Sequence, residues 1–381
     1  MKYDYIIAGS GCAGLSLLYR ILKDPQLCKK QILVIDKEQK NKNDRTWCFW
    51  EKGNGLFESI VTHQWETLEF LSNDFQHKFD MTNYRYKMIQ GIDFYNYVIN
   101  FAKQFENITF TSENITGITS VDDFAEVTTK NATYQAAYVF NSTNLFYPKM
   151  DTANSLLQHF EGWVIKTKTP VFDATVGRLM DFRLSQEHGA TFMYVLPTSE
   201  TEALVEYTLF TEKILKKEQY KKTLEGYIKD YLSIDNYEIL HTEFGIIPMS
   251  LAKFSRSVSN GKHIINLGTA GGFTKASSGY TFQFVQKHTE NIIELLKKGK
   301  HPNPKVTFRE KMYQWYDRTL LEVILSEKLE GKEIFTTIFK NRKIETILAF
   351  LGNESSILED IKVMSCLPIM PFLVSGLKQL K

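Results

Sequence analysis

The chain has 381 residues, 43% of them hydrophobic, and its 46 Lys and Arg against 44 Asp and Glu leave a net charge of +2. A chain of this length can bury a large core, and we expect two intertwined lobes. The balanced charge gives no support for nucleic-acid binding, and no apolar run is long enough to span a membrane. Four cysteines without a C-x-x-C pair predict a reducing, cytoplasmic setting and no structural metal.

The first strongly patterned stretch is a glycine-rich turn between an apolar run and a helical run. The apolar run 5–8 predicts a buried parallel strand, and G-x-G-x-x-G follows it at once. In this context the first glycine allows a tight turn, the second lets backbone N–H groups approach a pyrophosphate, and the third lets the helix pack closely on the strand. The helix N-terminus then faces the phosphates with its partial positive charge. The cofactor-contacting residues that we expect here are Gly9, Gly11, Ala13 and Gly14.

A second apolar run, 31–35, ends in Asp36, which lies 22 residues after Gly14. A β-α-β unit places at this position the carboxylate that bonds an adenosine ribose hydroxyl. The alternative is a glycine-rich loop in some other α/β domain, in which Asp36 only ends a strand.

Segment 43–51, N-D-R-T-W-C-F-W-E, combines two Trp, one Phe and one Arg, which is unusual for a surface loop. One interpretation is a loop along the cofactor, in which Arg45 contacts phosphate or the cofactor ring and the aromatic side chains form a wall of the active site. The other is a satellite hydrophobic cluster.

The middle of the chain alternates short strand-like runs with two helical runs. Apolar residues at helical spacing predict helices over 92–102 and 213–232, whereas 137–144 and much of 163–210 read as strands. An antiparallel lobe inserted into a dinucleotide fold indicates an FAD enzyme rather than a simple NAD dehydrogenase. We therefore expect an α/β protein with a Rossmann-type FAD-binding fold, an inserted, mainly antiparallel β substrate domain and a helical C-terminal tail. The expected boundaries are 1–62, 91–156 and 251–300 for the FAD-binding lobe, 63–90 and 157–250 for the substrate lobe, and 301–381 for the helical region.

A second glycine-rich turn lies between a predicted strand, 263–268, and a predicted helix, 279–298. Such a turn would present another helix N-terminus to a negatively charged part of the cofactor. A plain flexible loop explains four glycines in this position poorly. The residues that we expect to contact the cofactor here are Gly268, Gly271, Gly272, Gly279 and Tyr280.

The tail after residue 308 is helical in character, and 363–374 is apolar but broken by two prolines. This stretch is too short and interrupted to cross a bilayer. With Lys378 and Lys381 beyond it, it either sits at a membrane interface or packs back on the protein.

Several of these segments together resemble the bacterial FAD-dependent lycopene cyclase family. The most diagnostic is Asp44-Arg45-Thr46-Trp47-Cys48-Phe49-Trp50, which follows the dinucleotide unit. The pieces 171–174, 179–182, 192–197, 204–208 and 268–282 are also similar to family segments, so the resemblance covers most of the chain.

The resemblance implies a lycopene beta-cyclase-like enzyme that folds the ends of lycopene, or of a related acyclic carotenoid, into β-ionone rings. The reaction has no net redox change, yet the family depends on reduced FAD, with NAD(P)H as reductant. A cytoplasmic protein at the surface of the inner membrane is expected. Whether one or both ends are cyclised, and the oligomeric state, stay open.

The chemistry requires an acid that protonates a terminal alkene carbon, and burial can keep a carboxylic acid protonated. Glu206 lies in an apolar run at the position of the family's acidic motif, although Tyr207 stands where the family often has a second acid. The alternative for Glu206 is the outward face of an edge strand. Asp181 is a second candidate carboxylate near the flavin, or else a structural hydrogen-bonding residue. Trp47, Phe49, Trp50 and Tyr280 are the expected aromatic wall.

Two other classes of function fit the same motifs. A redox flavoenzyme, such as a monooxygenase, halogenase or polyene reductase, would consume NADPH or oxygen with every product molecule. A non-catalytic nucleotide-binding or sensor protein would turn nothing over.

Overall fold

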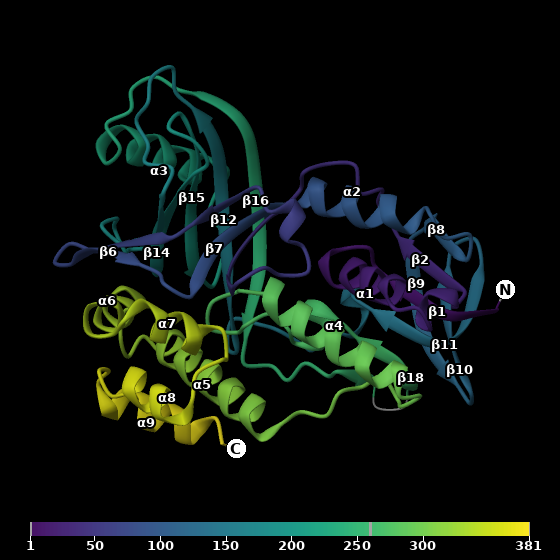
Figure 1. The fold of residues 1–381 in the computed structure, drawn as a ribbon. Coiled ribbons are helices and arrows are strands. Elements are labelled where there is room, and N and C mark those ends of the chain that lie inside the picture. The colour runs from purple at the N-terminus through teal and green to yellow at the C-terminus, as the bar shows by residue number, and fades with distance from the viewer. Residues whose placement is uncertain (1, 259–260, 381) are drawn as a thin grey trace.

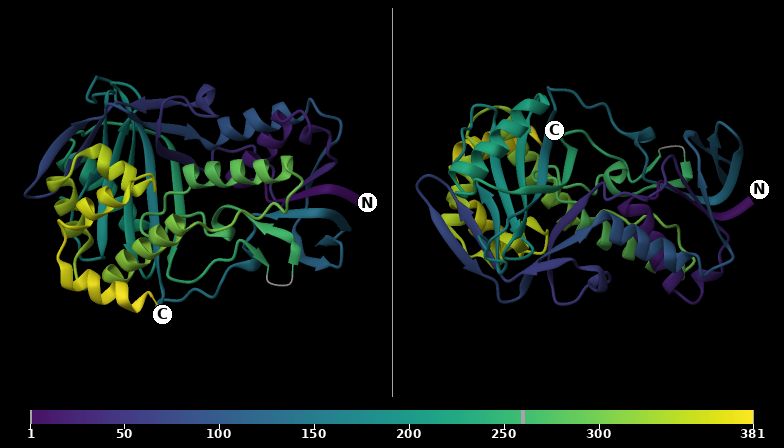
Figure 2. Two further views of the ribbon diagram at one scale, coloured as in Figure 1. Left: turned by 60° about the horizontal axis from the view of Figure 1, so that its bottom comes forward. Right: turned by 90° about the horizontal axis from the view of Figure 1, so that it is seen from above.

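The computed structural model describes residues 2–258 and 261–380, so that Lys381, one of the two lysines expected at the end of the tail, lies outside the described residues. Figure 1 shows two β-sheet lobes joined by long strands, with helices of the C-terminal region below one of them. The views in Figure 2 show the same separation of the two lobes. The α/β class, the two-lobed arrangement and the helical C-terminal region expected from the sequence are confirmed.

The first lobe is built on an eight-stranded sheet whose core is parallel. Its order is β17-β18-β11-β1-β2-β8, and β10 and β9 extend it from β11. The predicted strands at 5–8, 31–35 and 137–144 are its three central members. Strand β1 is fully buried at Ile6, Ile7 and Ala8, as expected for a parallel strand with both faces covered. The bounds are β1 Lys2–Ala8, β2 Ile32–Asp36, β8 Ile108–Ser112, β9 Ile115–Val121, β10 Phe124–Thr129, β11 Thr133–Asn141, β17 Ser257–Val258 and β18 Gly261–Asn266.

Three helices pack together on this sheet: α1 (Cys12–Lys23), α2 (Gly91–Ala102) and α4 (Phe282–Lys297). Figure 1 shows α1 beside α4 on one side of the lobe. Helix α2 matches the predicted helix 92–102. Helix α4 begins three residues later than predicted, because Gly279 adopts a left-handed φ of 71° that no α-helix accommodates.

The second lobe is a seven-stranded sheet in the order β16-β12-β15-β14-β13-β5-β6. All neighbours are antiparallel except β13 and β5, which run parallel. Helix α3 (Lys217–Asp230) packs on β15 and corresponds to the predicted helix 213–232. The bounds are β5 Thr67–Leu71, β6 Gln76–Asp80, β12 Ser155–Lys166, β13 Val176–Asp181, β14 Ala190–Pro197, β15 Glu202–Thr211 and β16 Glu238–Ser250.

A small sheet, β3-β7-β4, connects the lobes, and it corrects the interpretation of segment 43–51 as a loop. Only 43–45 is irregular, because β3 (Thr46–Lys52) pairs with β7 (Tyr84–Gln90), which also pairs with β4 (His63–Trp65). Strand β3 buries Phe49 in the apolar cluster of the first lobe and Trp50 in that of the second. Because side chains alternate along a strand, the run of aromatic residues serves two cores at once.

The C-terminal helices cover one face of the second lobe. Their cluster joins Phe335 of α6 and Leu348 of α7 to Phe192 of β14 and to Phe182, which directly follows β13. Among the described residues, no helix is long and apolar enough to cross a bilayer. Helices α8 and α9 lie farther from the sheet than α6 and α7 (Figure 1). The bounds are α5 Phe308–Leu325, α6 Gly331–Asn341, α7 Ile344–Leu351, α8 Ile357–Met364 and α9 Ile369–Lys378.

Candidate active site

The first glycine-rich turn has the geometry that its sequence predicts. Gly9 has a φ of 101°, in the left-handed region that favours glycine, and Gly11 is the N-cap of α1. A Cβ on Gly14 would lie 2.0 Å from the carbonyl oxygen of Gly9. The helix therefore packs closer to the end of the strand than any residue with a side chain at this position would allow. A Cβ on Gly11, by contrast, would meet no atom within 4 Å. The space in front of the helix N-terminus is therefore open to a ligand.

Asp36 stands at the end of β2, directly beside this turn. Its Oδ2 accepts a hydrogen bond of 2.7 Å from the backbone N–H of Ser10 and another of 3.0 Å from the Ser10 hydroxyl. Burial acts to raise the pKa of Asp36, but backbone hydrogen bonds from Glu38 and Ser10 and the charge of Lys40 outweigh it and lower the pKa. The side chain is thus held as a carboxylate, the form that accepts hydrogen bonds from a ribose.

The second glycine-rich turn packs against the first. The 3₁₀-helix η4 (Gly268–Gly271) follows β18, and Gly268 has a φ of 53°. A Cβ on Gly268 would lie 2.9 Å from the Cβ of Ala13 in α1. At the other end of the turn, a Cβ on Gly279 would lie 2.0 Å from Gln158 Oε1. Glycine at these two positions lets the turn lie between the two lobes.

One cavity, of about 400 Å³, contacts both glycine turns and the seven-stranded sheet. Its volume falls within the usual range of small-molecule sites. Of the predicted cofactor residues, six line it: Gly11, Ala13, Arg45, Gly268, Gly279 and Tyr280. Gly9, Gly14, Asp36, Gly271 and Gly272 shape the turns without lining this cavity.

Glu206 lines the same cavity from β15. Thr208 donates a 2.8 Å hydrogen bond to Glu206 Oε1. Burial, followed by the charge of Glu243, raises the pKa of Glu206 to about 8. The carboxyl is therefore protonated at neutral pH and able to act as an acid.

Glu243 also lines the cavity, although the sequence did not predict it as a site residue. It lies in β16, it is only 7% exposed, and its Oε2 accepts a 2.8 Å hydrogen bond from Thr46 Oγ1. Burial raises its pKa as well. Strands β15 and β16 both flank β12, and both glutamates pair with Gly162 of that strand. A Cβ on Gly162 would lie 3.2 Å from Glu243 Cγ and 3.4 Å from Glu206 Oε2. The missing side chain is what lets two carboxyls meet over the central strand.

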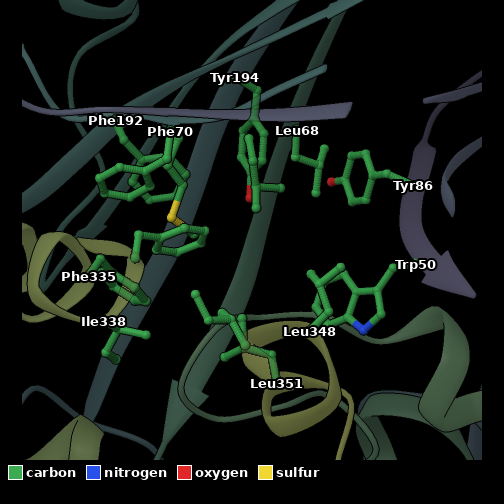
Figure 3. Packing of buried hydrophobic residues seen from close by; sticks show 14 of the residues in the cluster. Trp50, Leu68, Phe70, Tyr86, Phe192, Tyr194, Phe335, Ile338, Leu348 and Leu351 are labelled. Carbon is green, nitrogen blue, oxygen red and sulfur yellow. The ribbon is translucent and has the colours of Figure 1, made fainter. Parts of the chain in front are cut away.

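Aromatic side chains close the apolar side of the cavity. The hydroxyls of Tyr194 and Tyr280 lie 3.4 Å apart, and the ring of Trp50 meets that of Tyr280 edge-on at 4.5 Å. Figure 3 shows Tyr194, Tyr86 and Trp50 around the same body of apolar side chains. Of the expected wall residues, Trp47 and Tyr280 line the cavity, whereas Phe49 stacks on Phe282 at 4.4 Å and Trp50 stands behind Tyr280.

The structure does not bring Asp181 to the cavity. Asp181 is fully buried at the end of β13, where Arg183 binds it through two nitrogens at 2.6 and 2.9 Å and Tyr227 donates a hydrogen bond of 2.6 Å. Arg178 lies 3.7 Å away and also binds Glu69. These contacts correspond to the structural alternative for Asp181, since its oxygens are already occupied by cations and a phenol.

The cavity fits a dinucleotide cofactor by its own features. The open space at Gly11 adjoins a helix N-terminus, and Arg45 adds a positive charge. Gln158 and Ser278 line the cavity, and their buried atoms Gln158 Oε1 and Ser278 Oγ have no hydrogen-bond partner in the described chain, so each has bonding capacity left for a ligand. Among the described residues, no group of His, Cys, Asp and Glu has the arrangement of a metal site.

The two lobes and the paired glycine turns define a fold that solved flavoprotein structures share. A geranylgeranyl bacteriochlorophyll reductase-like protein from Thermoplasma acidophilum is similar with a TM-score of 0.64 and 14% identity, covering 100% of this chain and 99% of that one. A flavoprotein/dehydrogenase from Cytophaga hutchinsonii matches with a TM-score of 0.65, 14% identity and the same coverages. A flavin-dependent brominase gives 0.60 and 12%, over 96% of this chain and 98% of that one.

The lycopene cyclase protein family model matches residues 4–376, so the chain belongs to the lycopene cyclase family. No curated protein sequence matches the chain.

Proposed function

We propose that the protein is a lycopene beta-cyclase, which converts the end groups of lycopene to β-ionone rings, giving γ-carotene and then β-carotene without net redox change. Family membership supports the class of substrate. The single observation that carries the reaction type is the position of Glu206. Its carboxyl has a raised pKa and lines a cavity that aromatic side chains and both glycine turns also border.

Glu206 is the proton donor of this proposal. Its protonated carboxyl transfers a proton to a terminal alkene carbon of the polyene, which leaves a tertiary cation one carbon away. A nearby double bond of the same molecule attacks that cation and closes the ring, and the new cation loses a proton to restore an alkene. Because one proton is added and one is lost, the product has the mass of the substrate, and the carboxylate of Glu206 is available to take the proton back.

Glu243 is the partner of Glu206 rather than a second acid for the substrate. Thr46 fixes one of its oxygens and Thr208 fixes one oxygen of Glu206, so each carboxyl keeps the other oxygen for the pair. Two carboxyls this close cannot both ionise at neutral pH, and the pair therefore retains a proton. The nearby Glu243 thus keeps Glu206 protonated, as the first step of the reaction requires.

The cofactor of this proposal is FAD, held by the two glycine turns, Asp36 and Arg45. Bound FAD, reduced by NAD(P)H, would supply an electron-rich ring that stabilises positive charge next to it. From the chain itself, Tyr194 and Tyr280 line the cavity, where aromatic rings would stabilise a cation. Burial raises the pKa of Tyr280 to about 12, so this ring stays a neutral phenol during the reaction.

Expression in a lycopene-accumulating host, with pigment analysis by chromatography and mass spectrometry, tests the proposal. We expect γ- or β-carotene of unchanged mass from the natural chain and unconverted lycopene from Glu206→Gln. Unconverted lycopene from the natural chain, with flavin bound and its reductant supplied, would contradict the proposal.

The alternative is a redox flavoenzyme, since the similar structures include proteins named as a reductase-like protein and as a brominase. That function requires a product of altered mass and stoichiometric consumption of NAD(P)H or oxygen. A pigment that gains hydrogen, oxygen or halogen in the same assay would replace the cyclase proposal with this one.

A further inference from the structure

The strand that carries Glu243 also carries a histidine two residues earlier. Strand β16 is an edge strand of the seven-stranded sheet, and its residues alternate in burial around the carboxyl. Glu243 and Gly245 are buried, whereas Thr242 and Phe244 are exposed. Because side chains alternate along a strand, His241 shares the face of Glu243. Two such residues lie about 7 Å apart along the strand, a distance that an imidazole, a carboxyl and one bridging water can cover.

A β-bulge adjoins this histidine. His241 is in register with Val164 of β12. The next pair joins Ile239 to Ile165, so Leu240 is left out of the pairing with β12. Ile239 and Leu240 are 42 and 45% exposed, whereas His241 is exposed only in part. Bulges change the direction of the side chains next to them and are frequent beside active sites. His241 therefore lies where β16 passes from the carboxyl pair to the surface of the protein.

The imidazole of His241 has an unused nitrogen. Its Nε2 is buried and has no hydrogen-bond partner in the described chain. A buried polar atom in this state is unfavourable unless a water or another group bonds to it. Burial, the largest influence, raises the pKa of Glu243, whereas the charge of His241 is among the influences that lower it. The two side chains thus interact, and His241 does so without lining the cavity.

Other ionisable groups around the pair are poor carriers of protons at neutral pH. Arg45 also acts on Glu243, but a guanidinium does not release its proton in proteins. Burial raises the pKa of the Cys48 thiol and that of the Tyr194 phenol well above their usual ranges. An imidazole, in contrast, ordinarily binds and releases protons between about pH 5 and pH 8. Among these neighbours, His241 has the side chain that suits proton transfer.

A bound substrate would separate the pair from water on the cavity side. Glu206 and Glu243 both line the cavity that we propose for the polyene, so an apolar molecule there displaces water from them. A proton then reaches the pair through side chains at its other side. Because Glu243 is the member of the pair that shares a strand face with His241, the path runs from solvent to His241, then to Glu243 and then to Glu206.

We propose that His241 carries protons between solvent and the Glu206–Glu243 pair, acting through Glu243 and not on the polyene. The inference rests on the proposed cyclisation. Each ring closure moves one proton from Glu206 to an alkene carbon and returns one proton from the new ring to the carboxylate, so no oxidant or reductant is consumed. His241 lets the returned proton exchange with solvent before the next ring closes.

Cyclisation in D₂O by the full chain, loaded with flavin and supplied with reductant, tests the inference by mass spectrometry of the carotene. With free exchange, each ring gains one deuterium and loses one hydrogen, so the natural chain should give about one deuterium per ring. In His241→Phe the returned hydrogen is used again, and the deuterium content per ring over many turnovers should fall at least about threefold. The rate per flavin-loaded molecule should change by less than about twofold, because Glu206 still takes its proton back.

Two further variants guard against a purely structural effect. His77→Gln changes a histidine of β6, at the opposite edge of the same sheet, and should keep the deuterium content of the natural chain. His241→Ala should lose deuterium as His241→Phe does. Added imidazole should restore the deuterium content of His241→Ala, because the free base carries protons in place of the missing side chain. Circular dichroism and flavin content check that each variant is folded.

The possible outcomes separate this inference from the proposed function. Carotene with an unchanged deuterium content from His241→Phe and His241→Ala would overturn the inference and leave the cyclisation standing. An equal loss of deuterium in His77→Gln, or no effect of imidazole on His241→Ala, would overturn it as well. No carotene from the natural chain would contradict the proposed function, and the role of His241 would fall with it.

Discussion

Glu206 and Glu243 lie on strands that never pair with each other, yet both are in register with Gly162 on the strand between them. The two carboxyls therefore meet across a position that has no side chain. Burial disfavours the charged form of each carboxyl, and the nearness of the other disfavours it further for Glu206. Together, sharing a proton, they form a buried pair of acids on the side of the cavity that the seven-stranded sheet lines.

The first prediction concerns the acid itself. Glu206→Gln keeps the shape and the hydrogen bond from Thr208 but removes the transferable proton, so the rate of cyclisation should fall by about 10²–10⁴-fold. Flavin content after purification should be unchanged. Glu202→Gln, on the same strand but paired with Lys166 at the surface, is the control and should leave the rate unaffected. Full activity of Glu206→Gln would remove Glu206 from the mechanism.

The second prediction concerns the glycine between the carboxyls. In Gly162→Ala the new Cβ would lie 3.1 Å from Leu204 Cδ1, 3.2 Å from Glu243 Cγ and 3.4 Å from Glu206 Oε2, so we expect the two glutamates to move slightly apart. Weaker repulsion lowers the pKa of Glu206, but burial, the larger cause of the raised pKa, remains, so we expect about twofold lower activity at neutral pH. Gly117→Ala on β9, where a Cβ meets no atom within 4 Å, is the control. Equal kinetics of the two variants would show that the spacing of the carboxyls does not matter.

The third prediction is that the rate of cyclisation falls at high pH and does not fall at low pH. Activity requires protonated Glu206, whose pKa is raised to about 8, so the rate should be level at lower pH and fall as pH rises through about 8. In Glu243→Gln burial still acts on Glu206 but the neighbouring charge is gone, so the fall should move to lower pH. Rates measured from pH 5 to pH 9 check both statements. A rate that rises with pH would require a base instead of an acid.

The raised pKa of Glu206 also makes the free energy of unfolding depend on pH. The folded state holds the Glu206 proton more tightly than the unfolded state, so this contribution is full below the ordinary pKa of 4.5 and is lost as pH rises toward 8. Glu206→Gln should therefore flatten the decline in the free energy of unfolding over that interval. Denaturant titrations of both proteins at pH 5 and pH 8 measure the difference.

Features that depend only on neighbouring residues, such as the glycine turns, could be predicted from the sequence. The turn at Gly9–Gly14 needs glycine at fixed spacing whatever the rest of the chain does, and the structure has the expected conformation there. The aromatic segment from Thr46 was predicted as a loop because its pairing partner, β7, comes more than thirty residues later. A strand between two cores carries apolar residues on both faces and lacks the simple alternation that reveals a half-buried strand.

Glu243 was missed for a related reason. The sequence shows it as one acid between Thr242 and Phe244, and only the register of three strands places it against Glu206. The signal that was available is a glycine, Gly162, in a long strand-like run, because glycine within a strand often marks a close approach. Asp181 is the opposite case, a residue that was predicted for the site but lies outside it. No local pattern in the sequence revealed that Arg183 and Tyr227 already bind its carboxylate.

The fourth prediction separates two glycines of the first turn. Gly14→Ala places a Cβ 2.0 Å from a backbone oxygen and should lower the stability of the protein even without cofactor. Gly11→Ala meets no protein atom and should melt like the natural apoprotein, yet it should bind flavin more weakly because the new methyl group occupies the space in front of the helix N-terminus. Melting temperature and flavin content of both variants test this. Unchanged flavin affinity in Gly11→Ala would argue against a pyrophosphate at that position.

The fifth prediction concerns Asp181, which the structure places in an ion-pair cluster. Asp181→Asn keeps the size of the side chain but leaves Arg183 and the nearby Arg178 without their shared carboxylate. Removing one partner of a buried ion pair costs about 3 kcal/mol or more, so the midpoint of denaturation should fall clearly. The rate per folded, flavin-loaded molecule should stay near that of the natural chain, because Asp181 does not line the cavity. The reverse outcome, a stable protein with a lost rate, would return Asp181 to the catalytic machinery and require a route from β13 to the polyene.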